Sequence, residues 1–499
     1  MMTSISNSSV EKLVQDQPAQ VSETRPATQA ARNQQVTVRT VASRFVILML
    51  CLALVLSTLA YGTVHYWTLA IFQASAALVV FFWAVDAWRS RLLRISRNTL
   101  QWPLLGICLL ALVQLLPFGS APLSAATATE AARTLSLDPY STRLVLVQLL
   151  ALFVYFAAAL VFIDSPRRLR VVTHTIVIFS FALAIFGLIQ SFVSPTKIYG
   201  LRELGQSTAF GPFINRHHFA AYMEMALGLT AGLLLSGAVE REKRVLYIFA
   251  AAIMAIALVM TNSRGGIISL VAETFFIFVI TGVRIGRQRE EGEKRGRTRS
   301  LFVRAGLAFV LLFAVFSGVV FFGGEEVLSR FIGTVNAQDP TTGRVHFWRG
   351  TIGIIRDHPL IGSGLGSFGV AYTLYDTRDG IYRLEHAHND YLQTLSDAGI
   401  VGALLGLSFL VLLFRRGLAR RETDDLFRRG VATGALVGCF AVLVHSFFDF
   451  TLHTAANALL FLTLAALATL DGNVEERGQK PRRRRRHRHH QSSASSAVL

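Results

Sequence analysis

Apolar residues in this chain gather in long blocks, without the period-two alternation of an amphipathic strand. Many blocks are roughly twenty residues long, the length a helix needs to cross a hydrocarbon core about 30 Å thick. A helix satisfies its own backbone hydrogen bonds within lipid, so such blocks predict spanning helices. We therefore predict an all-α polytopic membrane protein with about 12 transmembrane helices. Their expected ranges are 45–62, 66–85, 103–118, 145–163, 171–192, 219–236, 245–261, 264–282, 302–322, 398–414, 430–446 and 455–470.

Basic residues collect at one set of ends of these predicted helices. They stand in DAWRSRLLRISR, DSPRRLR, EREKR, RIGRQREEGEKRGRTRS, RRGLARRETDDLFRRG and the C-terminal tail. Loops rich in Lys and Arg stay on the cytoplasmic side of a membrane. We therefore expect both termini to be cytoplasmic. The loops 119–143, 194–218, 262–264, 323–397 and 447–454 then lie on the external face.

The same pattern divides the chain into five parts. Residues 1–43 are polar and lack the apolar core of a signal peptide, so we expect a disordered cytoplasmic tail. Residues 44–322 hold the first nine predicted transmembrane helices, and residues 398–472 hold the last three. Residues 323–397 form a large external loop, which we expect to be partly helical because it contains HFWRGTIGIIRDHPLIGSGLGSF. Residues 473–499 are a basic cytoplasmic tail.

Composition and charge agree with this organisation. The chain is 52% hydrophobic and 16% charged, with a mean hydropathy of +0.47. Its net charge of +18 lies mainly in short segments between apolar blocks and in the tail, which indicates topology and contact with anionic lipid and not nucleic acid. The three cysteines all fall inside apolar blocks, where we expect small buried side chains without a disulfide.

Two arginines lie beside predicted helices on the less basic, external face. Arg216, in GPFINRHHFAAYMEM, opens one helix, and Arg264, in MTNSRGGIISL, opens another. Each could simply extend toward lipid phosphate. Two guanidinium groups on one face favour an anion site instead, because their planar donors match phosphate oxygens and a helix start adds a favourable dipole.

A third arginine lies in the external loop. Arg344 precedes Trp348 by four residues, so the two share a face of the predicted helix. Arg344 could contribute to the same anion site. It could also do no more than pair with a carboxylate such as Asp357.

Two histidines stand just before the tenth predicted span. His386 and His388 belong to EHAHNDYLQTLSDAGIVG (385–402), where an imidazole can exchange protons near neutral pH. A metal site would need a third ligand, and the external segments contain no HExxH or CxxC motif. We therefore expect neither a metal nor a cofactor. Other polar groups near this boundary are left outside the expected site: His217, His218, His445, Asp449 and His453.

These blocks together resemble the O-antigen ligase and oligosaccharide polymerase superfamily over roughly residues 190–450. The resemblance rests on Asn215-Arg216, on Ser-Arg-Gly-Gly at 263–266, on GRVHFWRGTIGIIRDHPLIGSGLGSF at 343–368 and on HNDYLQTLSDAGIVG at 388–402. The last block is the most specific. The family pattern of His, then Asn or a similar residue, nine residues and Gly is matched by His388, Asn389 and Gly399. Ligases tend to carry Thr three residues later, where this chain has Gly402.

The resemblance implies a glycosyltransferase in the bacterial inner membrane. Such an enzyme moves an oligo- or polysaccharide from undecaprenyl diphosphate to an acceptor hydroxyl on the periplasmic side. Carried over to this chain, the catalytic histidine is His388 and the diphosphate-binding arginines are Arg216 and Arg264. The external loop would then be periplasmic and contain the catalytic segment. Possible supporting residues are Arg344, Asn389 and His386.

The expected reaction is an inverting displacement with a neutral imidazole as general base. The arginines would stabilise the leaving diphosphate, a role often held by Mg²⁺, and no Asp-x-Asp pair lies in an external segment. We therefore expect metal-independent transfer.

Several alternatives stay open at this point. The acceptor could be lipid A-core for a ligase, the next carrier-linked repeat for a polymerase, or a protein for an O-oligosaccharyltransferase. A lipid-glycan flippase or transporter is the non-enzyme alternative, but we detect neither repeat symmetry nor acidic residues near mid-membrane. A regulatory or structural membrane protein would tolerate Ala at Arg216 and His388.

Overall fold

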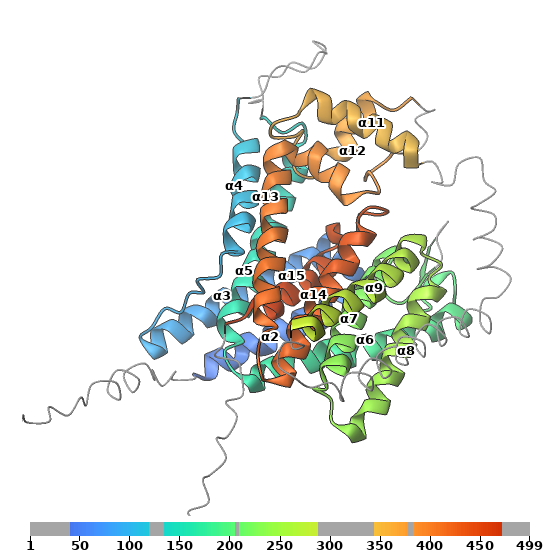
Figure 1. Ribbon diagram of the computed structural model, residues 1–499. Helices are drawn as coiled ribbons and strands as arrows, with labels where there is room; N and C mark the ends of the chain where they lie inside the picture. The colour runs from blue at the N-terminus through green and yellow to red at the C-terminus, as the bar shows by residue number, and fades with distance from the viewer. Residues whose placement is uncertain (1–39, 119–133, 205–208, 288–343, 378–382, 472–499) are drawn as a thin grey trace, which may run out of the picture.

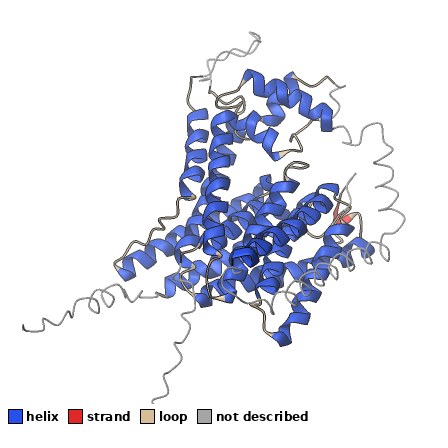
Figure 2. Cartoon of the chain, in the orientation of Figure 1, coloured by secondary structure: helices blue, strands red, loops and turns tan. Residues whose placement is uncertain are grey.

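The computed structural model describes residues 40–118, 134–204, 209–287, 344–377 and 383–471 (Figure 1). Nearly all regular structure in these residues is helical, and the strands form one short antiparallel pair (Figure 2). The predicted all-α class is therefore confirmed. In chain order the elements are α2 (Val41–Leu59), η1 (Tyr61–Thr63), α3 (Tyr66–Ser90), α4 (Gln101–Gln114), α5 (Pro139–Phe162), α6 (Pro166–Val193), β1 (Lys197–Ile198), β2 (Arg202–Glu203), α7 (Arg216–Ser236), η3 (Arg241–Lys243), α8 (Arg244–Met260), α9 (Arg264–Arg287), α11 (Arg344–Asp357), α12 (Phe368–Ala371), η5 (Tyr372–Leu374), α13 (Asp390–Arg420), α14 (Leu426–His445), η6 (Thr451–His453) and α15 (Ala455–Thr469).

The helices support the predicted polytopic membrane protein. Within the described residues, nine helices are long and apolar enough to cross a membrane, and α4 and α15 are shorter apolar helices. Each predicted span in this part of the chain overlaps one of these helices. The span predicted at 302–322 lies outside the described residues.

Helix α15 lies in the centre of the bundle (Figure 1). Every residue from Ala455 to Thr469 is buried, and the helix packs against α2, α5, α7, α13 and α14. A helix surrounded by protein need not present an apolar surface of full membrane length to lipid. Its short apolar sequence therefore forms part of the core.

Helices α7 and α14 form a close pair beside α15. Small residues allow two helix backbones to approach closely in a membrane. Here Gly228 faces Gly438 and Gly232 faces Gly434, so that a Cβ atom added at Gly232 would lie 2.3 Å from the Cα of Gly434. This packing fixes the start of α7 against the end of α14. Both ends carry polar side chains.

Arginines gather at the opposite end of the bundle, where several helices end. Arg428 donates hydrogen bonds to the carbonyls of Leu467 and Leu470, at the end of α15, over 2.9 Å each. Arg421 donates to the carbonyl of Ile280 in α9, and Arg429 to a carbonyl at the end of α7. Positive side chains stabilise the unpaired carbonyls of helix ends. Arg428 and Arg429, which belong to RRGLARRETDDLFRRG, therefore also cap helices.

Helix α13 begins eight residues earlier than the span predicted at 398–414. The side chain of Asn389 caps its start by accepting from the backbone N–H groups of Tyr391 and Leu392. The first two turns contain polar residues that are buried within the protein, such as Gln393 and Ser396. Hydropathy alone places the start too late because it does not distinguish burial in protein from exposure to lipid.

Gly399 bends α13 where the loop after α11 crosses it. Its φ is +62°, a value that favours glycine, and an added Cβ would lie 2.4 Å from the carbonyl carbon of Leu360. The backbone N–H groups of Ile400 and Val401 donate to the carbonyls of Pro359 and Leu360 across this bend. The conspicuous glycine therefore joins α13 to the segment that carries α11. Figure 1 shows α11 and α12 together at one end of the bundle.

Candidate functional site

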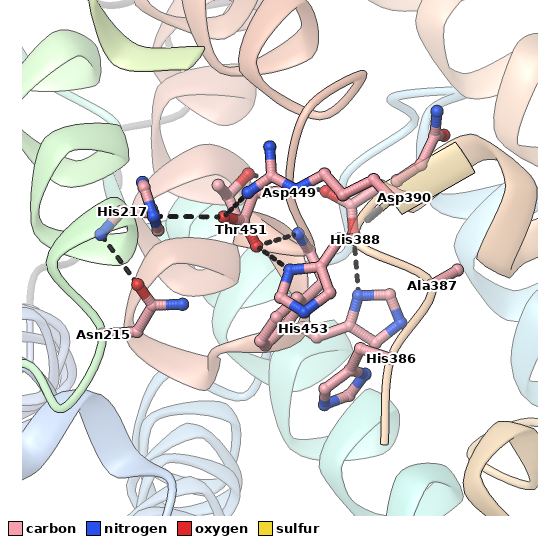
Figure 3. A network of polar contacts seen from close by, with 12 residues as sticks. Asn215, His217, His386, Ala387, His388, Asp390, Asp449, Thr451 and His453 are labelled. Atoms are coloured by element: carbon pink, nitrogen blue, oxygen red, sulfur yellow. Dashed lines mark hydrogen bonds and ion pairs between the residues drawn. The ribbon is translucent and has the colours of Figure 1, made fainter. Parts of the chain in front are cut away.

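Asp449 lies at the centre of a polar network at the end of α14. Its side chain is only 1% exposed. One carboxylate oxygen lies 3.2 Å from Nδ1 of His388, and the other lies 3.5 Å from a guanidinium nitrogen of Arg344 and 3.9 Å from Nε2 of His217. Figure 3 shows His217 and His388 on opposite sides of this carboxylate. The network thus joins four segments that are far apart in the sequence.

His388 occupies a constrained position between a loop and α13. Its φ of +52° is unusual for a residue other than glycine, and such conformations concentrate at functional sites. The next residue, Asn389, caps α13 and donates from its side-chain amide to the carbonyl of Phe447 over 3.1 Å. Asn389 therefore fixes the backbone beside His388 and connects it to the segment that carries Asp449.

A second contact fixes the same two segments together. Asp390 accepts a hydrogen bond from Ser446 Oγ over 2.7 Å, and its backbone N–H donates to the Ser446 carbonyl over 2.9 Å. Its other carboxylate oxygen lies 2.7 Å from Nδ1 of His453. Burial would lower the pKa of His453, but the hydrogen bond and charge of Asp390 raise it overall. Asp390 therefore holds the loop after α14 in place.

His386 packs beside His388 without joining the Asp449 network. Its ring stacks on Phe450 with centroids 4.0 Å apart, and the His388 ring meets the same Phe450 edge to face at 5.0 Å. Gln393 accepts from the Ala387 N–H through Oε1, so its amide nitrogen donates to Nδ1 of His386 over 3.0 Å. Burial lowers the pKa of His386 to about 3, with smaller contributions from His453, His218 and His388. His386 is therefore neutral at ordinary pH and is held by packing.

Arg344 reaches Asp449 from the first position of α11. The helix is fixed over the His388 segment by Trp348, whose ring nitrogen donates to the carbonyl of Ala387 over 3.1 Å. The alternative that Arg344 pairs with a carboxylate is confirmed, but the partner is Asp449 and not Asp357, which accepts from the hydroxyl of Tyr375. Helix α11 extends away from Arg344, and this carries Asp357 to its far end.

Arg216 and Arg264 are the first residues of α7 and α9. Arg216 is half-buried and precedes His217, whereas the Arg264 side chain is exposed and follows Ser263. His217 Nδ1 lies 2.8 Å from Ser263 Oγ, so the two helix starts lie side by side. The helix starts that carry Arg216 and Arg264 therefore lie close together, and His217 and Asp449 connect this region to His388.

The electrostatics of the centre favour an ionised Asp449. Burial by itself would raise the pKa of this carboxyl. The hydrogen bond from His388, the electrostatic interactions with His217 and His388, and a smaller contribution from His218 outweigh burial and lower the pKa below its ordinary value. An ionised Asp449 accepts the Nδ1–H of His388, which leaves the lone pair of Nε2 on the other edge of the ring. The arrangement can therefore accept a proton at that nitrogen.

The sequence interpretation missed part of this site. It left Asp449 and His217 outside, because aromatic and polar residues at a membrane boundary usually act only as anchors. It also missed the buried carboxyl groups of Glu224 in α7 and Glu273 in α9, although the transporter alternative had been set aside partly because no acidic residue near mid-membrane was noticed. Among the described residues, no group of three or more His, Cys, Asp or Glu side chains is arranged to hold a metal ion.

A comparison with known protein families finds a match in the middle of the chain. Residues 249–407 match the model of a protein family described as O-antigen ligase. The matched segment contains Arg264, Arg344 and His388, whereas Arg216 and Asp449 lie outside it. No curated protein matches the chain.

Proposed function

The chain belongs to the O-antigen ligase superfamily, and we propose that it transfers glycan from undecaprenyl diphosphate to an acceptor hydroxyl at the outer end of its helical bundle. The reaction is the inverting, metal-independent transfer of an O-antigen ligase. The protein lies in the bacterial inner membrane with both termini in the cytoplasm, and the site faces the periplasm. The observation that carries this proposal is the contact between His388 and Asp449, next to the paired starts of α7 and α9.

His388 acts as the general base. A sugar hydroxyl is a poor nucleophile at neutral pH, and a base placed to remove its proton typically contributes about 10²–10⁴ in rate. Asp449 holds the Nδ1–H of His388, so the Nε2 lone pair is the one that accepts the proton. As the acceptor oxygen bonds to the anomeric carbon, the bond from that carbon to the diphosphate oxygen breaks.

Arg216 and Arg264 bind the diphosphate. The leaving group gains negative charge in the transition state, and donors fixed in advance stabilise that charge without reorganising. Both arginines stand at helix starts, where the helix dipole also favours an anion. Arg344 is paired with Asp449, so its main contribution is to hold that carboxylate in place.

The proposal is tested with purified protein in detergent. Undecaprenyl-diphosphate glycan is supplied with lipid A-core, a carrier-linked repeat or an acceptor protein, each with and without excess EDTA. Transfer to lipid A-core that continues in EDTA is the expected result. Transfer only to a carrier-linked repeat or to protein would assign a polymerase or an O-oligosaccharyltransferase instead.

The same experiment also tests the non-enzyme alternative. A flippase or transporter forms no product in detergent, because it needs two compartments and not an acceptor. Absence of product with all three acceptors would therefore contradict an enzymatic function. Strict dependence on a divalent cation would contradict the role assigned to the arginines.

A further inference from the structure

A chain of polar side chains runs from the site into the membrane-spanning bundle. His217 Nδ1 lies 2.8 Å from Ser263 Oγ, and Ser263 Oγ lies 3.3 Å from Nε2 of His445. On its other edge, His445 Nδ1 lies 3.2 Å from both carboxyl oxygens of Glu224. Ser263, His445 and Glu224 are all buried. Burying ionisable side chains within the membrane costs free energy, so a connected set of them indicates a functional role.

The hydrogen bonds between these polar side chains have a preferred direction. Glu224 and His445 can share one proton, as an ion pair or as a neutral acid with a neutral imidazole, and both forms have no net charge. Losing that proton would leave an unbalanced negative charge in the bundle, which is expensive. The carboxyl of Glu273, which is also buried, lies beside Gly228, one turn along α7 from Glu224.

With one proton shared, His445 carries a hydrogen on Nε2 in either form. That N–H donates to Ser263 Oγ, so the Ser263 hydroxyl donates to Nδ1 of His217. His217 in its neutral form must then carry its hydrogen on Nε2, the edge that faces Asp449 at 3.9 Å. The two imidazoles on either side of Asp449 therefore differ, because His388 has its hydrogen on Nδ1 and His217 has its hydrogen on Nε2.

We propose that His217 is an additional N–H donor to the leaving diphosphate, held in its Nε2–H form by Ser263, His445 and Glu224. This inference rests on the function proposed above and adds a residue to the diphosphate site. His217 stands directly after Arg216, and its partner Ser263 stands directly before Arg264. A neutral donor between two helix starts binds the anion without adding a charge that could be lost near neutral pH.

The hydrogen positions can be measured without any transfer reaction. The full-length protein is labelled with ¹⁵N-histidine in lipid, and the ring nitrogens of His217 and His388 are assigned by the loss of signals in His217→Asn and His388→Asn. We expect a protonated Nε2 for His217 and a protonated Nδ1 for His388. A protonated Nδ1 on His217 in the parent protein would overturn the proposal.

Substitutions among these polar side chains test which groups hold His217 in its Nε2–H form. Ser263→Ala removes the link, so His217 should show a mixture of both neutral forms. Glu224→Gln keeps a donor next to Nδ1 of His445 and should preserve the parent pattern if the protein folds normally. An unchanged His217 spectrum in Ser263→Ala would show that the buried groups do not control it.

Binding of undecaprenyl diphosphate separates this inference from the proposed function. A hydrogen bond to a charged group is typically worth a factor of roughly 10–100 in affinity, so His217→Ala should weaken binding by about that factor. The control is His174 in α6, whose ring contacts Phe427 near the start of α14, at the opposite end of the bundle. His174→Ala should bind undecaprenyl diphosphate as tightly as the parent protein. Parental affinity in His217→Ala would overturn the donor role alone. A parent protein that does not bind this lipid would contradict the proposed function, whatever form His217 takes.

Discussion

The carboxylate of Asp449 lies 3.2 Å from Nδ1 of His388, although the two residues stand 61 positions apart in the chain. Asp449 is almost fully buried, whereas His388 keeps part of its ring accessible. A buried carboxylate that holds one edge of an imidazole leaves the other edge for a reaction. In the proposed function the two residues therefore have opposite roles, Asp449 as orienting group and His388 as proton acceptor.

Replacing Asp449 tests the orienting role. In Asp449→Asn the amide nitrogen can donate to Nδ1 of His388, which moves the ring hydrogen to Nε2 and removes the lone pair from the reacting edge. We expect the rate of glycan transfer to fall by roughly 10²–10⁴, close to the loss of a general base. The affinity for undecaprenyl diphosphate should change little. Steady-state kinetics with both substrates separates the two effects.

A matched control lies in another His–Asp pair. His346 and Asp376 are 3.6 Å apart and belong to α11 and the segment after η5, outside the Asp449 network. Asp376→Asn should therefore transfer glycan at nearly the parental rate. A similar loss in both variants would mean that the effect at Asp449 is not specific to the site.

Replacing the two helix-start arginines tests the diphosphate site. Lysine keeps the charge but loses the planar pair of donors, so Arg216→Lys and Arg264→Lys should both weaken binding of the lipid diphosphate. Alanine should weaken it further, by a factor of roughly 10–100 at each position. Arg356→Ala, an exposed position on α11, is the control and should bind normally. Tight binding in a double Arg216→Ala and Arg264→Ala variant would refute the assignment.

Gly399 should be needed for stability as well as for the family pattern. An alanine there is strained by the φ of +62° and collides with the Leu360 backbone, so we expect Gly399→Ala to cost about 1–3 kcal/mol. Gly406 lies two turns further along α13, and an added Cβ meets no atom within 4 Å. Gly406→Ala should be neutral or slightly stabilising. Thermal unfolding in detergent compares the stability of the two variants. Equal unfolding midpoints would contradict the claim that the bend in α13 requires glycine at position 399.

The pKa of His386 predicts a dependence of stability on pH. Burial lowers it from 6.5 to about 3, so between these values the unfolded chain binds a proton that the folded chain does not. The contribution of His386 to stability is therefore lost as the pH falls below 6.5. In His386→Gln this loss should disappear, so the difference in unfolding midpoint between parent and variant should change between pH 6.5 and 3. A constant difference across this range would show that His386 titrates normally.

Much of the architecture follows from the sequence because long apolar blocks can only be helices in lipid. The starts of α7 and α9 are identified in this way, since an arginine beside an apolar block is costly and easily noticed. The start of α13 was misplaced because its first turns are polar and buried in protein. Hydropathy measures only the residue and not its surroundings.

The partners in the site could not be obtained in the same way. Asp449 contacts His388 only because α14 and α7 pack closely through glycines and Asp390 fixes the loop that follows α14. Such contacts depend on three-dimensional packing between segments, and a single sequence contains no direct record of it. Two signs were available, however. Asp449 and Glu224 are carboxyl groups within or next to apolar blocks, where they need a reason to be present.

The central claim is that His388 removes the proton from the acceptor hydroxyl. The most direct test is the rate of glycan transfer by His388→Gln at saturating donor, compared with the parent protein and with binding of undecaprenyl diphosphate measured on the same samples. We predict a loss of roughly 10²–10⁴ in rate with nearly unchanged binding. Transfer at the parental rate by folded His388→Gln would contradict the account.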